Sequence, residues 1–132
     1  MNYSLMNSNE KHIETFDFGV AELHRDYILM VMNEGITVDF EINRQLCEYA
    51  ANYYKNRQFG YITHRKNSYS VDPYVYKETS KLKGLVAFAI VSDKHIRRET
   101  AILEKIFLNK PLRTFKELNT AIAWVQSHTN SN

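Results

Sequence analysis

The chain has 132 residues, of which 44% are hydrophobic and 24% charged, the size and composition of one ordinary globular domain. A domain of this size folds around its own core without metals or disulfides, so these values exclude a chain that is disordered throughout. We expect a flexible N-terminus over residues 1–11, a folded domain over residues 12–127 and a flexible C-terminus over residues 128–132.

The net charge of +2 hides an uneven distribution. Residues 1–54 carry nine acidic and three basic side chains, whereas residues 55–132 carry six acidic and fourteen basic ones. Such an asymmetry is typical of a nucleic-acid or membrane-binding face, of head-to-tail self-association, or of a fold that simply interleaves the two halves.

The number of cysteines and the hydropathy of the chain indicate in which cellular compartment the protein resides. The single cysteine, Cys47, cannot form a disulfide within the chain, which fits a reducing environment. The first residues are mostly polar, unlike a signal peptide, and the longest apolar run, residues 85–91, is far shorter than the roughly 18 residues of a membrane span. We therefore expect a cytoplasmic protein without a transmembrane segment.

The chain opens with an extended pattern. Apolar and polar residues alternate over residues 13–23, where Gly19 indicates a kink or bulge. Residues 24–26 form a turn, and the apolar run 27–32 is typical of a strand covered on both faces. Together they predict a β-hairpin.

A helix is predicted next, with Thr37 as N-cap and apolar residues at helical spacing to about residue 56. Residues 59–63 predict a short strand, and a polar loop follows it. Asp72 and Pro73 then favour a second helix that ends at Gly84, because aspartate caps free amides and proline fits the first helical position.

The remaining elements follow the same alternation. Residues 85–91 predict a central strand, and residues 92–93 cap a third helix that ends at residues 109–111. Residues 112–113 offer a very short strand, and Thr114 with Glu117 resembles a capping box at the start of a last helix. This order predicts a single α/β domain with a mixed sheet of 4–5 strands, starting with the hairpin and flanked by about four helices.

Motifs for cofactor chemistry are missing. The four glycines are too far apart for a P-loop or a dinucleotide-binding fingerprint. No two histidines have the spacing of a helical metal site, and although His24 and His64 could converge at strand ends, closed metal sites need three or four ligands. We predict neither a cofactor nor a metal site.

Nucleophilic catalysis finds weak support. Cys47 lies mid-helix beside the apolar stripe, as expected of a buried small hydrophobe. His64 with Ser68 or Ser70 and Asp72 would supply the groups of a hydrolase, but no nucleophile elbow accompanies them. We expect no enzyme and keep this hydrolase as an alternative.

The loop over residues 65–73 is the candidate binding site. It leads from a strand into a helix N-terminus, the edge at which open α/β sheets bind ligands and where anions are favoured. The alternative is a hydrophilic loop that ends in a helix cap. The candidate ligand- or partner-binding residues are Arg65, Lys66, Ser68, Tyr69, Ser70 and Asp72.

Aromatic residues are numerous, with nine tyrosines and seven phenylalanines. Many tyrosines surround the first two predicted helices and the third predicted strand, where they would line an apolar pocket or a dimer interface, or pack the core. They do not alternate with basic residues along one strand, so we expect no specific nucleic-acid binding.

Three segments carry a family resemblance: residues 59–73, residues 85–91 and residues 115–125. They resemble bacterial STAS/SEC14 domain-containing proteins of the SpoIIAA-like group. The resemblance implies a mixed sheet flanked by helices, as in anti-sigma-factor antagonists, which carry a phosphorylatable serine in an Asp-Ser-Ser/Thr-Gly motif. Residues 68–73 lie at the matching place without that motif, so whether Ser68 or Ser70 is phosphorylated stays open.

The sequence thus predicts a non-enzymatic STAS-like binding or regulatory module. Its partner would be a protein or a small anionic or apolar ligand at residues 65–73. The SEC14 part of the resemblance implies the alternative of a small apolar- or lipid-ligand binding protein, and a homodimer is a further expectation.

Overall fold

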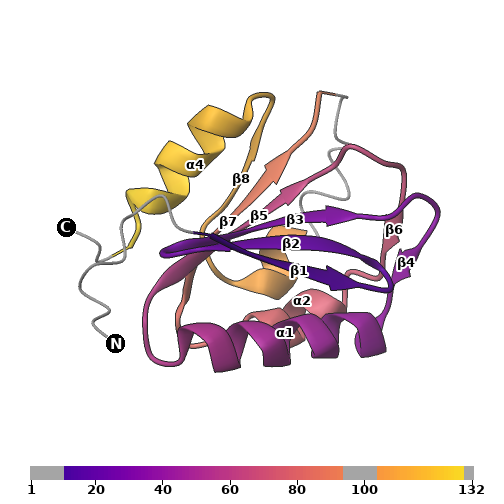
Figure 1. Ribbon diagram of the computed structural model, residues 1–132, viewed down its shortest axis with the longest axis horizontal. Helices are drawn as coiled ribbons and strands as arrows, with labels where there is room; N and C mark the ends of the chain where they lie inside the picture. Colours follow the sequence, from indigo (N-terminus) through magenta and orange to yellow (C-terminus); the bar gives the residue numbers. More distant parts are fainter. Residues whose placement is uncertain (1–10, 94–103, 130–132) are drawn as a thin grey trace.

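The protein folds around a six-stranded mixed sheet with helices on both faces (Figure 1). The computed structural model describes residues 11–93 and 104–129. The sheet has the order β1-β2-β3-β5-β7-β8, and its strands are β1 (Lys11–Phe16), β2 (Gly19–His24), β3 (Tyr27–Met32), β5 (Phe59–His64), β7 (Leu85–Val91) and β8 (Leu112–Phe115). The α/β class and the mixed sheet are confirmed.

The other elements are a small ribbon and the helices. The ribbon pairs β4 (Thr37–Val38) with β6 (Ser70–Val71) in parallel. The helices are α1 (Phe40–Tyr54), α2 (Val75–Thr79), α4 (Leu118–Gln126) and a further one whose described part is residues 104–108. In the described ranges, no helix is long and apolar enough to cross a membrane.

The predicted hairpin is a three-stranded antiparallel meander. The chain reverses between Phe16 and Gly19, which face each other as the last pair of β1 and β2, so the sheet has one more strand than expected. Gly19 is required here, because a Cβ atom would lie 2.4 Å from the carbonyl oxygen of Val31 on β3. The glycine therefore marks a close approach between strands.

The second half of the sheet is parallel. β3 pairs with β5, β5 with β7, and β7 with β8, all in the same direction. β7 is an interior strand, as its unbroken apolar run predicts. The carboxyl ends of β3, β5 and β7 meet at one edge, which the β4–β6 ribbon adjoins (Figure 1).

The capping residue of α1 differs from the predicted one. Thr37 lies in β4, and the N-cap is Asp39, whose Oδ1 accepts a hydrogen bond from the amide of Ile42 at 3.0 Å. At the other end, the Tyr54 hydroxyl lies 2.6 Å from the carbonyl oxygen of His24. This contact attaches α1 to the turn between β2 and β3.

Two further helix starts were also predicted wrongly. α2 is a helix of five residues, and Asp72 serves the turn before it by accepting from the amide of Tyr74 at 3.1 Å. Thr114 lies in β8, and the N-cap of α4 is Glu117, which makes no side-chain cap bond. The predicted caps of the third helix, residues 92–93, are described, but the helix expected to follow them begins outside the described residues.

Helices cover the two faces of the sheet unequally (Figure 1). α4 packs over the parallel strands, where Val125 lies so close to the backbone of β5 that a Cβ atom on Gly60 would be 2.6 Å from Val125 Cβ. α1 and α2 cover the opposite face, together with Leu108 of the partly described helix. The larger of the two apolar cores is on this second face.

Candidate functional site

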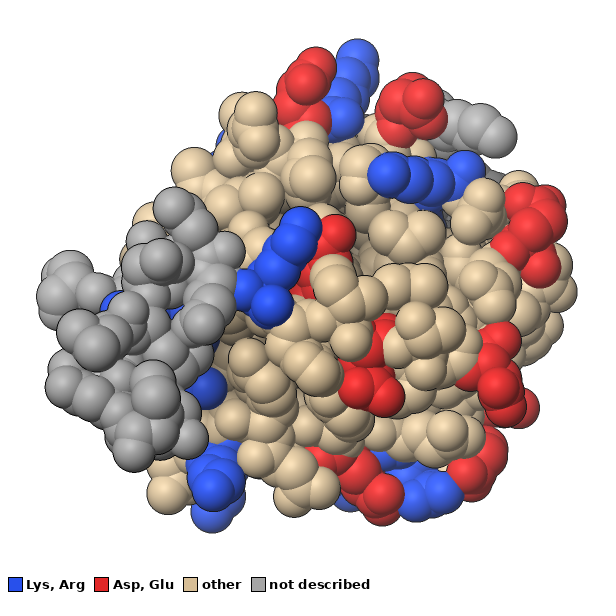
Figure 2. All heavy atoms as spheres, viewed as in Figure 1, with Lys and Arg blue, Asp and Glu red and all other residues tan. Residues whose placement is uncertain are grey.

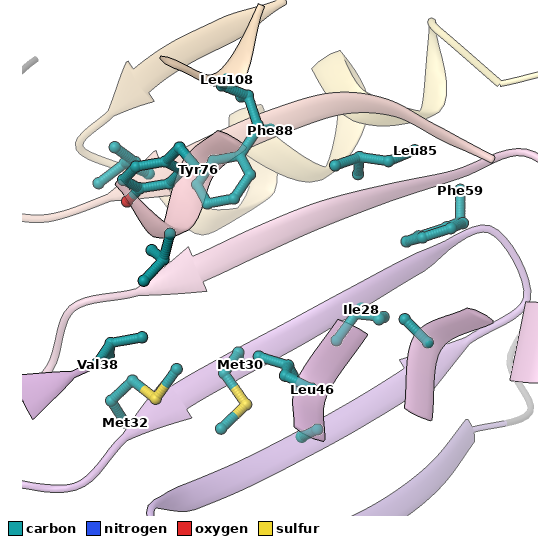
Figure 3. Packing of buried hydrophobic residues seen from close by; sticks show 14 of the residues in the cluster. Ile28, Met30, Met32, Val38, Leu46, Phe59, Tyr76, Leu85, Phe88 and Leu108 are labelled. Carbon is teal, nitrogen blue, oxygen red and sulfur yellow. The ribbon is translucent and has the colours of Figure 1, made fainter. Parts of the chain in front are cut away.

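An apolar cavity of about 40 Å³ lies between α1, α2 and the sheet, on the face opposite α4. Figure 3 shows Tyr76 and Phe88 on one side of this region and Met32, Val38 and Leu46 on the other. The lining residues are Met32, Val38, Asn43, Leu46, Cys47, Ala50, Tyr61, Thr63, Tyr69, Val71, Val75, Tyr76, Thr79, Leu82 and Phe88. The cavity is thus mainly apolar, with a few polar groups in its wall.

Asn43 and Thr79 join the two helices at this wall. The Asn43 amide donates to Thr79 Oγ1 at 3.0 Å and to the carbonyl oxygen of Val75 at 3.2 Å. Thr79 Oγ1 lies 3.2 Å from Asn43 Oδ1 and also 3.2 Å from the Val75 carbonyl oxygen. Both side chains are buried and already hydrogen-bonded to each other. Their role in the described structure is to hold α1 against α2.

Cys47 contributes its thiol to the same wall. Burial raises the pKa of this thiol to about 11, and the hydrogen-bonding contact with Thr79 counteracts only part of that rise. The thiol is therefore protonated at neutral pH, whereas a nucleophilic cysteine needs a lowered pKa. Cys47 behaves as the small hydrophobe that its place in the helix indicates.

The loop over residues 65–73 forms one wall of the cavity through Tyr69 and Val71. The Tyr69 hydroxyl lies 2.7 Å from Thr63 Oγ1 on β5. Backbone hydrogen bonds tie the loop to the β4 segment, since Gly35 donates to the Ser68 carbonyl at 2.7 Å. The middle of the loop is therefore folded inward.

The candidate site residues divide into two groups. Arg65 and Tyr69 come together, with the guanidinium carbon 5.6 Å from the centre of the Tyr69 ring. Lys66 and Ser68 are exposed, and the Ser68 amide donates to the carboxylate of Glu34 at 2.9 Å.

Ser70 and Asp72 have structural contacts of their own. Ser70 pairs with Thr37 in the β4–β6 ribbon, where its amide donates to the carbonyl of Ile36 at 3.0 Å. Asp72 accepts from Tyr74 in the turn before α2. These two residues hold the loop in place, whereas Tyr69 lines the cavity and Arg65 lies over the Tyr69 ring.

Sequence reasoning missed the carboxylate that pairs with Arg65. Glu104 is 1% exposed, and its Oε2 accepts from Arg65 Nη2 at 3.1 Å and from the Tyr76 hydroxyl at 2.7 Å. Within the described residues, neither Glu104 Oε1 nor Arg65 Nε has a hydrogen-bond partner. The available signal was an acidic residue one helical turn before the buried Leu108, at an inward-facing position.

The ion pair keeps Arg65 charged. Burial acts to lower the pKa of Arg65, but Tyr69, Tyr76 and Glu104 outweigh it, so the pKa is raised. Burial also raises the pKa of Tyr76, and the Glu104 carboxylate adds to the rise. A positive charge and a protonated phenol are therefore fixed features of this end of the sheet.

His64 points away from the loop hydroxyls. Side chains alternate along a strand, and since Thr63 faces Tyr69 and the cavity, His64 faces the opposite side of the sheet. Its pKa is lowered, first by burial and then by Lys66. Among the described residues it forms no hydrogen bond with Ser68 or Ser70, so the geometry gives the hydrolase alternative no support.

The surface charges on the viewed face are mixed. Figure 2 shows acidic and basic side chains side by side along the edge where α1 lies in Figure 1. On α1 itself, Arg44 lies 2.8 Å from Glu48 and also contacts Glu41. The acidic first half of the chain therefore includes local ion pairs.

Comparisons with known proteins identify the fold. No protein-family model matches the chain, and no curated protein matches it. The structure is similar to that of an uncharacterized protein of the DUF3478 family with a SpoIIAA-like fold, from Shewanella loihica PV-4. The TM-score is 0.54 at 17% identity, and the match covers 91% of this chain and 98% of that one. The chain thus has a SpoIIAA-like fold, while the SEC14 part of the sequence resemblance finds no support.

Proposed function

We propose that this protein is a non-enzymatic binding module that holds a small, mainly apolar molecule in the cavity between α1, α2 and the sheet. The proposal rests on the cavity wall, which consists mostly of apolar side chains with a few polar groups among them. Binding pockets for small molecules have this composition. The loop over residues 65–73 takes part as an inner wall, through Tyr69 and Val71.

The volume of about 40 Å³ is room for water-sized molecules, so a larger ligand has to displace part of the wall. Of the cavity wall, the part around Tyr69 should need the least free energy to move. The Tyr69 side chain is held by one hydroxyl contact with Thr63 and by Arg65 over its ring, and the adjoining β4–β6 ribbon has only two residue pairs. Segments with few backbone bonds open locally more easily than central strands.

Three features support a binding role over catalysis. The Cys47 thiol is protonated, Asn43 and Thr79 satisfy each other, and His64 faces away from the cavity. Catalytic sites instead bring a nucleophile within reach of a base. The described wall is suited to enclosing a ligand without reacting with it.

The test is a thermal-shift screen with hexanoate, 1-hexanol and indole. Ala50→Leu is the cavity-filling variant, because Ala50 is buried in the wall, and Ala51→Leu is its control on the exposed side of α1. We expect at least one probe to raise the melting temperature of the wild type and of Ala51→Leu, since a ligand that binds the native state stabilises it.

Ala50→Leu should lose that shift, measured against its own melting temperature without probe. If no probe shifts the wild type, or if Ala50→Leu responds as the wild type does, the cavity is not the binding site.

A further inference from the structure

The sheet ends on one side in a regular edge strand, β1. It comes first in the strand order and pairs with β2 alone among the described strands. Its six residues pair with β2 in unbroken register, so β1 has no bulge, and it contains no proline. The other edge strand, β8, has four residues and directly follows Pro111. Short strands, bulges and prolines protect an edge from pairing with another chain, and β1 lacks all three.

One face of β1 is apolar and open. Glu14 accepts a hydrogen bond from Tyr49 of α1, so the even-numbered residues of β1 face this helix. By strand alternation, Ile13 lies on the other face of the sheet, where it is 47% exposed. Val20 of β2 is opposite Thr15, so it lies on the same face as Ile13, and it is 39% exposed. α4 covers the parallel strands of this face and leaves these two side chains in contact with solvent.

A second copy of the chain can pair with the free edge of β1 in few registers. In an antiparallel pair, opposite residues lie on the same face of the sheet, so a two-fold axis passes through a residue that opposes its own copy. An axis at Glu14 would bring two carboxylates together, which is destabilising. An axis at His12 would leave Glu14 beyond the end of the other β1. An axis at Ile13 avoids both, and it places Lys11 opposite Thr15 and His12 opposite Glu14.

His12 and Glu14 are complementary across this axis. Within one chain, His12 Nε2 lies 3.2 Å from Glu14 Oε1, and the Tyr49 hydroxyl donates to the same oxygen at 3.0 Å. The second oxygen, Glu14 Oε2, has no hydrogen bond among the described residues, and the side chain of His12 is 52% exposed. An N–H of His12 in the other copy can donate to this oxygen whether the ring is charged or neutral. The two-fold axis produces the contact twice.

We propose that the protein forms a two-fold dimer in which the β1 strands of two copies pair antiparallel, with Ile13 at the axis. The pairing extends the sheet through both copies, adds main-chain hydrogen bonds along β1 and brings the two Ile13 side chains into contact. A contact between two strands buries less area than a standard interface, so the dimer should be weak. No residue of β1 lines the cavity, so this inference is independent of the proposed function.

Sedimentation equilibrium of the full chain tests the dimer at concentrations from about 10 μM to about 1 mM. The mass of the wild type should rise from that of one chain towards that of two. Ile13→Lys should weaken association about tenfold, because it removes the apolar contact and places two ammonium groups at the axis. Val20→Lys is the matched control, since it makes the same change on the same face but on β2. It should associate as the wild type does.

A charge exchange tests the register. Glu14→Lys should weaken association about tenfold, because it places an ammonium group opposite His12. Adding His12→Glu to this variant restores opposite charges across the axis and should recover most of the lost affinity. Both variants lose the hydrogen bond from Tyr49, so this loss does not account for the recovery.

Each possible result supports or contradicts the dimer. A wild type that is monomeric at about 1 mM overturns the proposal and leaves residues 1–10 or a different protein as candidates for covering the edge. Equal losses in Ile13→Lys and Val20→Lys also overturn it, because they indicate docking through the apolar face. A failure of His12→Glu to restore association contradicts the axis at Ile13. Both lysine variants change exposed side chains, so similar melting temperatures should exclude unfolding as the cause of lost association.

Discussion

Arg65 at the end of β5 donates to the buried carboxylate of Glu104, with Nη2 and Oε2 3.1 Å apart. The same oxygen accepts from the hydroxyl of Tyr76, whose ring lines the cavity. Arg65 also lies over the ring of Tyr69 on the neighbouring wall. The Arg65–Glu104 ion pair therefore contacts Tyr76 and Tyr69, which lie on two sides of the cavity wall.

Removing the carboxylate should destabilise the protein strongly. Glu104→Ala leaves Arg65 without its partner and the Tyr76 hydroxyl without its acceptor, so we expect a loss of about 3 kcal/mol in the free energy of unfolding by urea. Glu48→Ala breaks the exposed contact with Arg44 and should cost no more than about 0.5 kcal/mol. Equal effects of the two substitutions would show that the Glu104 pair contributes no more than a surface contact.

The single cysteine provides a probe of the cavity. Because the pKa of Cys47 is raised from 9.0 to about 11, its thiolate fraction at pH 8 is about a hundredfold below that of an unperturbed thiol. We expect correspondingly slow labelling by a thiol reagent in the native protein, faster labelling as the pH rises towards 11, and further slowing by a bound ligand. Labelling at the rate of the urea-unfolded chain would contradict the buried placement of the thiol.

The close packing of α4 on β5 should require a glycine, which has no side chain, at position 60. A Cβ atom at position 60 would lie 2.6 Å from Val125 Cβ, so Gly60→Ala should destabilise the protein by about 1–3 kcal/mol through overpacking. Val125→Gly removes the colliding Cβ together with its methyl groups, and adding it to Gly60→Ala should cost less than Val125→Gly costs in the wild type. If the losses of stability from the two substitutions simply add in thermal or urea unfolding, the strain in Gly60→Ala does not come from the contact with Val125.

Local sequence patterns correctly predicted those elements whose structure depends on a single segment of the chain. The apolar run of β7 and the helical spacing in α1 needed no partner to be recognised. The turn between Phe16 and Gly19 was missed because both sides of it continue the same alternation, and the close approach of Val31 that requires the glycine is a contact with another strand. The prediction of Thr37 as a cap is wrong because Thr37 pairs with Ser70, 33 residues further along the chain, and a local pattern does not indicate such strand pairing.

The positions of the candidate residues in the fold were predicted only in part. Residues 65–73 do lie at the carboxyl edge of the parallel strands, and Arg65 and Tyr69 do meet there. Glu104 and Tyr76 reach Arg65 from distant parts of the chain, and the cavity arises only when α1 and α2 pack together. Such contacts depend on tertiary packing, which periodicity and motifs do not encode.

The most direct test of the account is an NMR titration of the isotope-labelled protein with hexanoate. We predict that the shift changes concentrate on residues of the cavity wall, with Tyr61, Cys47 and Tyr69 among the largest, and that they saturate. Changes confined to the exposed rim around Lys66 and Ser68, or no change at all, would contradict a ligand inside the cavity.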